Sequence, residues 1–238
     1  MATTDKTGTV LELARRGPLR ARDLDEHGVP RAYLRRLCDR GDLERVDRGL
    51  YRLPDAPATE AHALALVAKR VPHATVCLLS ALQFHELTTE LPSAVWIMID
   101  RAARTPSLRY PRLEVVRASG AARTFGIEHE RIEGVDVAIT TPAKTVADCF
   151  RYRRHVGLDV ALDALRDFIA RGSGKPTRRE REALERGDGF GHGGAYGVGK
   201  ASGDGCGDPS VYSMGTLVAA ARADRVYNVM RPYMEALV

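Results

Sequence analysis

Residues 18–53 read PLRARDLDEHGVPRAYLRRLCDRGDLERVDRGLYRL, and this stretch decides the fold of the amino-terminal part of the chain. Two short helical patterns meet at the turn His27-Gly28-Val29-Pro30. Glycine can adopt the positive φ that ends one helix, and proline suits the first position of the next. Two strand-like runs follow, residues 43–46 and 50–53, around a hairpin tip at residues 47–49. Together with a first helix over residues 7–16, this order predicts a winged helix-turn-helix.

The helix that follows the turn, residues 30–40, is basic on the face that it leaves free. Leu34, Leu37 and Cys38 recur at i, i+3 and i+4, so one apolar stripe is expected to dock on the domain core. The free face can then enter the major groove of DNA, and the hairpin can contact the backbone. The predicted DNA contacts are Arg31, Arg35 and Arg36 on the helix and Arg45 and Arg48 on the hairpin, with Arg52 suited to the same backbone contacts.

The alternative interpretation is a solvated helix face beside an ordinary hairpin. We favour DNA binding because the turn, the basic helix and the Arg48-Gly49-Leu50-Tyr51-Arg52 hairpin occur in the required order. Sequence does not decide between base and phosphate contacts for these arginines.

The composition agrees with a globular protein that has an acidic partner. The chain has 238 residues, a net charge of +5, an isoelectric point near 9.2 and 44% hydrophobic residues. Its four cysteines are scattered and form no Cys-x-x-Cys pair, which argues against a zinc site. Residues 1–9 are polar, and no apolar run approaches the ~20 residues that cross a bilayer. We expect a cytoplasmic protein without cofactor, metal or membrane contact.

The sequence after residue 54 predicts a second domain of mixed α and β structure. The Pro54-Asp55-Ala56-Pro57 joint marks the boundary, so the expected domains are residues 1–54 and 58–238. Helices are expected at residues 59–69, 158–170 and 212–237, the last kinked or broken at Pro232. Another begins at Thr141 and Pro142, as cap and first position. Strands are expected at residues 95–99, 113–117, 126–130 and 134–140, and a strand start followed by a helix at residues 75–87. The predicted fold class is α+β.

Residues 187–209 are dense in glycine and almost free of aliphatic side chains. Such a segment cannot bury enough apolar surface to fold, so we predict a disordered insertion. Within it, residues 194–200 nearly spell a phosphate-binding loop. Ala201 stands where a Ser or Thr would hold magnesium, and no buried strand precedes the loop. We therefore do not assign nucleotide binding to it.

Two further motifs can be interpreted as sites or as structure. His85, beside Phe84 and Glu86, is expected to be a hydrogen-bonded core histidine rather than a catalytic one. Lys144 and Asp148 stand at i and i+4, the spacing of a surface ion pair worth ~0.3–0.5 kcal/mol. Alternatively, Asp148 forms a contact patch with the basic residues Arg151, Arg153 and Arg154, which would also suit a nucleic-acid backbone. No catalytic residue is assigned.

Five segments, taken in order, resemble the AbiEi family of bacterial antitoxins from type IV toxin–antitoxin, or abortive infection, systems. They are RGLY at residues 48–51, SALQFHELT at 80–88, VWI at 95–97, TPAKTVAD at 141–148 and RPYME at 231–235. The glycine-rich tract has no counterpart in that pattern.

The resemblance implies a protein with two jobs and no catalytic activity of its own. The winged domain would repress its own operon by binding inverted repeats in promoter DNA. The second domain would counteract a cognate nucleotidyltransferase-type toxin, without an obligatory stable complex. The alternatives are a nucleic-acid-processing enzyme, such as a nuclease or transferase with a winged targeting domain, and a ligand-responsive winged regulator without a toxin.

Overall fold

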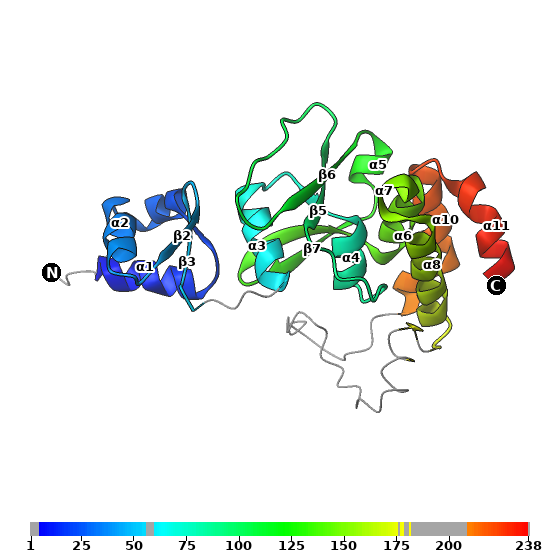
Figure 1. Cartoon of the computed structure of the whole chain (residues 1–238), viewed down its shortest axis with the longest axis horizontal. Coiled ribbons are helices and arrows are strands. Elements are labelled where there is room, and N and C mark those ends of the chain that lie inside the picture. The colour runs from blue at the N-terminus through cyan, green and yellow to red at the C-terminus, as the bar shows by residue number, and fades with distance from the viewer. Residues whose placement is uncertain (1–4, 56–59, 176, 179–180, 182–208, 238) are drawn as a thin grey trace. The chain divides into compact units, whose positions relative to one another are not determined.

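The computed structural model describes residues 5–55, 60–175, 177–178, 181 and 209–237 (Figure 1). The chain divides into two compact units. Unit 1 comprises residues 1–73, 105–112 and 130–137, and unit 2 comprises residues 74–104, 113–129 and 138–238. Helices and strands are mixed along the described part of the chain, which confirms the α+β class.

Unit 1 begins with three short helices around a small antiparallel sheet. The helices are α1 (Lys6–Arg15), the 3₁₀ helix η1 (Ala21–His27) and α2 (Ala32–Asp39). Strands β1 (Leu19–Arg20), β2 (Glu44–Asp47) and β3 (Leu50–Arg52) pair in the order β1-β3-β2. The elements enclose a core of eight buried apolar side chains: Val10, Ala14, Leu19, Leu24, Val29, Leu34, Leu37 and Leu43.

This order of elements follows the prediction, with two differences of detail. The second helix is a tight 3₁₀ helix, and the Asp23 side chain accepts a hydrogen bond of 2.8 Å from the Arg20 backbone N–H at its start. A carboxylate thus supplies the cap that no Ser or Thr provides. Strand β1 was not predicted, because two residues carry no alternating pattern. Gly28 has φ 61° and ends η1, as expected.

Helix α3 (Glu60–Arg70) completes the larger elements of unit 1. Residues 61–68 are all buried, so this helix is enclosed on every side rather than amphipathic. Its carboxyl end is joined to η1 and the hairpin by polar contacts. Lys69 pairs with Asp23 at 2.7 Å, and Arg70 pairs with Asp47 at 3.2 Å. Within unit 1, the carboxyl end of α3 therefore contacts both η1 and the hairpin.

The second sheet has five strands in the described residues, in the order β6-β5-β4-β8-β7. They are β4 (Thr75–Val76), β5 (Val95–Asp100), β6 (Leu113–Ala118), β7 (Ile127–Ile132) and β8 (Val135–Thr140). β5 runs parallel to β6 from Val95↔Leu113 to Asp100↔Ala118, and β4 is antiparallel to β5 and parallel to β8. The tip of the β7–β8 segment, residues 130–137, groups with unit 1. All four strands predicted beyond residue 90 are present.

Helix α6 (Pro142–Arg151) lies at the centre of the helices of unit 2 (Figure 1). Every side chain from Pro142 to Phe150 is buried, including those of Lys144 and Asp148. It contacts α4 (Leu78–Phe84), α8 (Leu158–Gly172) and α10 (Met214–Ala223). The shorter helices are α5 (Ala121–Thr124), α7 (Arg153–Val156) and η2 (Pro209–Tyr212). Thr141 caps α6 as predicted, its side chain accepting from the Lys144 N–H.

The prediction of one carboxyl-terminal helix over residues 212–237, kinked or broken at Pro232, is wrong because the segment forms two helices. The break falls between α10 and α11 (Tyr227–Leu237), and Pro232 lies inside α11 with its side chain exposed. Arg225 takes φ 59°, and the Val226 N–H donates back to the Ala221 carbonyl at 2.9 Å. This is a Schellman ending with arginine in the position that usually holds glycine.

Three expectations lie outside the described residues: the disorder of residues 187–209 apart from Pro209, the loop at 194–200 and the state of Cys206. Cys77 and Cys149 are buried free thiols and Cys38 is half-buried. Burial raises the pKa of the Cys77 and Cys149 thiols. No helix among the described residues has the length and apolar character needed to span a membrane.

Candidate nucleic-acid interface

Helix α2 presents the basic face that the sequence predicts. Leu34 and Leu37 are each 1% exposed and fix the helix on the core of unit 1. Arg31, Arg35 and Arg36 are all exposed on the remaining surface. The guanidinium of Arg36 lies over the ring of Tyr33, 5.1 Å from its centroid. The apolar stripe therefore orients the arginines toward solvent rather than into the domain.

The other two helix arginines have weak local partners. Arg31 pairs with Asp25 at 2.8 Å, and Arg35 stands 3.9 Å from Asp39 at the next helical turn. The Arg35 side chain is 89% exposed. Ion pairs as exposed as these are worth little and exchange readily for a phosphate or a base.

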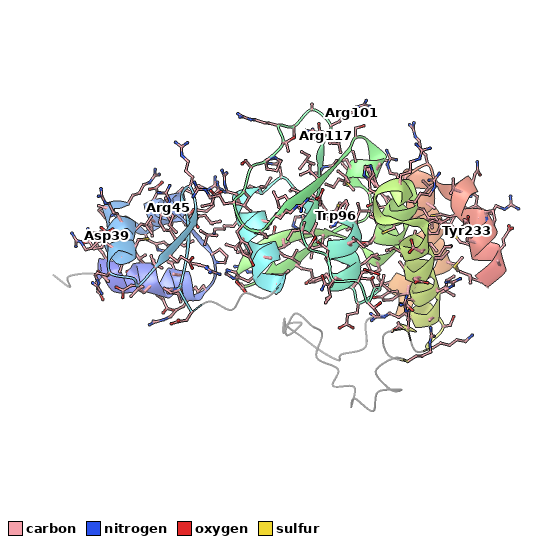
Figure 2. All side chains as sticks on the ribbon, in the orientation of Figure 1. Asp39, Arg45, Trp96, Arg101, Arg117 and Tyr233 are labelled. Atoms are coloured by element: carbon pink, nitrogen blue, oxygen red, sulfur yellow. The ribbon has the colours of Figure 1, made fainter. Side chains whose placement is uncertain are left out.

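The hairpin places its arginines differently. Arg45 and Arg48 are exposed, and Figure 2 labels Arg45 on the hairpin and Asp39 near the end of α2. Arg52 instead pairs with Glu44 across the β2–β3 ladder at 2.8 Å, and its side chain is only 18% exposed. Arg52 thus holds the hairpin together. Arg48 and Arg45 remain exposed, and the Arg45 Nε donates to the Asp47 carbonyl at 3.3 Å.

A basic cavity of about 190 Å³ opens between η1, the start of α2, the hairpin tip and the end of α3. Five arginines line it: Arg20, Arg22, Arg31, Arg48 and Arg70. Of these, Arg31 and Arg48 belong to the predicted set. Arg20, Arg22 and Arg70 were not predicted, because they stand on other elements and no single helical or strand pattern groups them.

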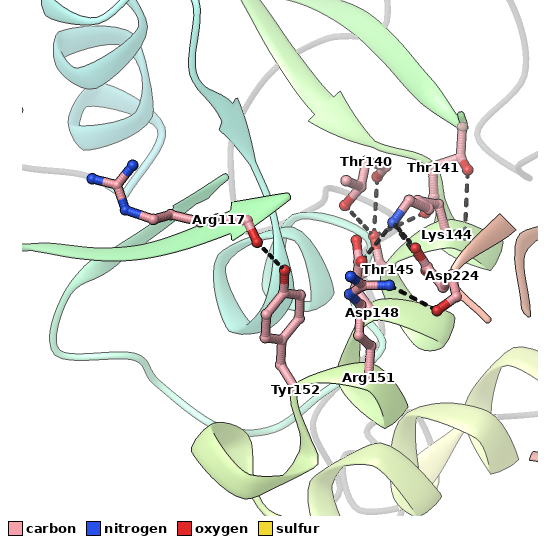
Figure 3. A network of polar contacts seen from close by, with 9 residues as sticks. All are labelled: Arg117, Thr140, Thr141, Lys144, Thr145, Asp148, Arg151, Tyr152 and Asp224. Atoms are coloured by element: carbon pink, nitrogen blue, oxygen red, sulfur yellow. Dashed lines mark hydrogen bonds and ion pairs between the residues drawn. The ribbon is translucent and has the colours of Figure 1, made fainter. Parts of the chain in front are cut away.

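A second polar cluster lies in unit 2, and its core was predicted to be a surface pair. Lys144 and Asp148 are both fully buried, with 0% of either side chain exposed. The Lys144 Nζ donates to Asp148 and to both carboxylate oxygens of Asp224, at 2.8 and 2.9 Å (Figure 3). Both the surface-pair interpretation and the contact patch of Asp148 with Arg151, Arg153 and Arg154 are therefore wrong.

The neighbours of this cluster connect helix ends and strands. Arg151 Nη1 donates to the Asp224 carbonyl at 2.8 Å, and the Tyr152 hydroxyl donates to the Arg117 carbonyl at 2.8 Å (Figure 3). Thr145 Oγ1 donates to the carbonyl of Thr140, the last residue of β8, at 3.0 Å. Helix α6 is thereby tied at one end to the carboxyl end of α10 and at the other to the end of β8.

The charge of the cluster is set by burial. The pKa of Asp148 is raised to about 8, chiefly by loss of hydration; Lys144 lowers this pKa, and the nearby Asp224 carboxylate raises it. Burial also raises the pKa of Asp224. Burial lowers the pKa of Lys144, but the two carboxylates together outweigh this effect and raise it. Asp148 Oδ2 has no hydrogen-bond partner among the described residues, which favours a neutral carboxyl. One ammonium, one carboxylate and one carboxylic acid leave the site without net charge.

His85 behaves as predicted. His85 is the residue that ends α4, and its side chain is buried. Its Nε2 lies 2.7 Å from the carbonyl oxygen of Thr140. The described residues hold no group of three or more His, Cys, Asp or Glu side chains arranged for a metal ion. The candidate site is the set of exposed cationic groups in unit 1.

Three helices, an antiparallel hairpin and a basic second helix of the turn are the features of the winged helix-turn-helix class. Residues 9–54, which span these elements, match the family described as transcriptional regulator, AbiEi antitoxin. The resemblance noted from the sequence is thus confirmed over residues 9–54, the segment that is similar to this family of antitoxins and transcriptional regulators.

The whole fold has a counterpart among solved structures. The chain is similar to the crystal structure of the RV2827C protein from Mycobacterium tuberculosis, with a TM-score of 0.51 and 15% identity. The similarity covers 92% of this chain and 81% of that one. At this identity it concerns the fold alone. A comparison with curated proteins gave no significant match.

Proposed function

We propose that this protein is a DNA-binding antitoxin that represses its own promoter and counteracts a nucleotidyltransferase-type toxin. The family match over residues 9–54 supports the proposal most directly. The exposed arginines on α2 and the hairpin support it independently, because they supply the cations that a DNA backbone and guanine edges require.

The DNA contacts are assigned to five side chains. Arg31, Arg35 and Arg36 would face the major groove, and Arg45 and Arg48 would contact the flanking backbone. The target is promoter DNA with inverted repeats, so two copies of the domain would each occupy one half-site. Repeats about one helical turn apart would place both copies on one face of the duplex.

The second domain is proposed to carry antitoxicity, without catalysis of its own and without an obligatory stable complex. The protein would act in the cytoplasm, where its promoter and its toxin would both be found. An enzyme with a winged targeting domain would instead turn over nucleic acid or nucleotides as a pure protein.

Co-expression tests the proposal. Cells carrying the neighbouring nucleotidyltransferase gene alone should stop growing, and cells that also carry this chain should grow. The variant Arg31→Ala/Arg35→Ala should still restore growth while losing repression of a promoter reporter, since the two jobs use different domains. Failure of the wild-type chain to restore growth would contradict the antitoxin assignment.

A further inference from the structure

The cavity of about 190 Å³ in unit 1 is lined by more cations than local ion pairs neutralise. Arg31 is paired with Asp25 and Arg70 with Asp47. The Arg20 guanidinium donates to the Lys69 carbonyl at 2.7 Å, which leaves its positive charge in place. Within the described part of the chain, Arg22 and Arg48 have no hydrogen-bond or ion-pair partner. The cavity thus holds more positive charge than the neighbouring carboxylates neutralise.

Backbone pairing holds these side chains in place. Arg20 stands opposite Leu50 in the β1–β3 ladder, and the Ala21 N–H donates to the Gly49 carbonyl at 3.0 Å. This pairing places Arg22 next to the hairpin tip. Burial lowers the pKa of Arg20, and the charges of Arg22 and Arg70 lower it further, so the guanidinium groups repel one another across the cavity.

We propose that this cavity is a phosphate-binding site for the DNA backbone, with Arg22 and Arg48 as the two side chains that grip one phosphate. Guanidinium groups bind phosphate oxygens through paired N–H donors, and two unpaired ones on facing elements suit a single phosphate. Arg20 and Arg70 supply a fixed positive background, and Arg31 joins the cavity to the recognition helix.

The position of the cavity favours a backbone phosphate over a small effector. It opens beside both the amino end of α2 and the hairpin tip, where a duplex docked on α2 would pass. The inference therefore rests on the proposed DNA binding and adds η1 and α3 to its surface. A nucleotide effector also carries phosphate groups and is the competing ligand for this cavity.

The test compares full-length Arg22→Gln and Arg48→Gln with the wild type, by titrating promoter DNA over a range of salt concentrations. Each variant should weaken binding about tenfold and lower the slope of log K against log salt by about one. The loss of DNA affinity in the double variant should be smaller than the product of the two single-variant losses, because both side chains hold the same phosphate. Arg15→Gln is the matched control: Arg15 is an exposed arginine outside the cavity, and its removal should change neither quantity.

The outcomes separate this inference from the proposed function. If Arg31→Ala/Arg35→Ala weakens binding while Arg22→Gln keeps both affinity and salt slope, the phosphate site is wrong and DNA binding stands. If the wild type does not bind duplex DNA, both are wrong. Calorimetry with ADP and with inorganic phosphate forms the second arm. Saturable ADP binding that Arg22→Gln abolishes, with DNA binding unchanged, would assign the cavity to a nucleotide and overturn the proposal.

Discussion

A single buried lysine links α6 to the carboxyl end of α10 in unit 2. Lys144 is the only cation that the structure places between Asp148 and Asp224 in the described residues, and all three side chains are buried. Removing one member of a buried ionic cluster leaves uncompensated charge, which costs about 3–5 kcal/mol. Lys144→Met should therefore lower the free energy of unfolding by that amount in chemical denaturation at neutral pH.

The control for this prediction is Arg154→Met, which removes an exposed cation one turn beyond α6 and should change stability by less than about 0.5 kcal/mol. Similar losses for both variants would mean that burial of Lys144 has no energetic consequence.

The raised pKa of Asp148 predicts that the stability of the folded protein depends on pH. Between its ordinary pKa of 3.8 and about 8, the folded protein keeps a proton that the unfolded chain has lost. The folded state then binds more protons, so this group's contribution to stability falls as pH rises through that window. The slope is at most about 1.4 kcal/mol per pH unit.

Asp148→Asn separates this group from all others, because asparagine resembles the neutral carboxyl. Denaturant unfolding from about pH 5 to about pH 8 should show that the wild type loses stability relative to the variant as pH rises. A wild type that gains stability relative to Asp148→Asn over the same range would contradict the neutral-acid assignment.

At the scale of elements, the ending of α10 is an arginine in a left-handed conformation. Arg225 has φ 59°, which costs a residue with a Cβ about 1 kcal/mol compared with glycine. Arg225→Gly should therefore raise the unfolding free energy by about 0.5–1 kcal/mol in thermal or chemical melts. Arg222→Gly, one turn earlier inside α10, should lower it by about 1 kcal/mol. Equal losses for both would show that Arg225 has another structural role.

Local patterns in the sequence predicted elements well and long-range partners poorly. The turn at Gly28, the basic face of α2, the strands of unit 2 and the cap at Thr141 each depend on neighbouring residues, and all are found. Lys144 and Asp148 matched an exposed i, i+4 pair because Asp224, 76 residues after Asp148 and 80 after Lys144, gave no signal of its own. The break before α11 was assigned to Pro232 for a similar reason, since Arg225 carries no mark of a left-handed residue.

The candidate site shows the same division. Arg31 and Arg48 were found because they lie on elements with clear patterns. Arg22 and Arg70 come from η1 and α3, and only the pairing of β1 with β3 and the contacts of Asp47 bring them to the same cavity.

At the scale of the whole molecule, the chain combines a basic amino-terminal domain with a second unit held by a neutral buried cluster. The net charge of +5 is modest, so DNA binding should depend on where the arginines stand rather than on total charge. Binding should accordingly weaken steeply with salt, with a slope near −0.9 for each phosphate contacted.

The most direct test titrates promoter DNA with the wild-type chain and with Arg31→Ala/Arg35→Ala, both at full length. We expect the wild type to bind and the variant to lose about 1–3 kcal/mol for each base contact, or about one unit of salt slope for each phosphate contact. Equal affinity and equal salt slope for the two proteins would show that helix α2 does not recognise DNA.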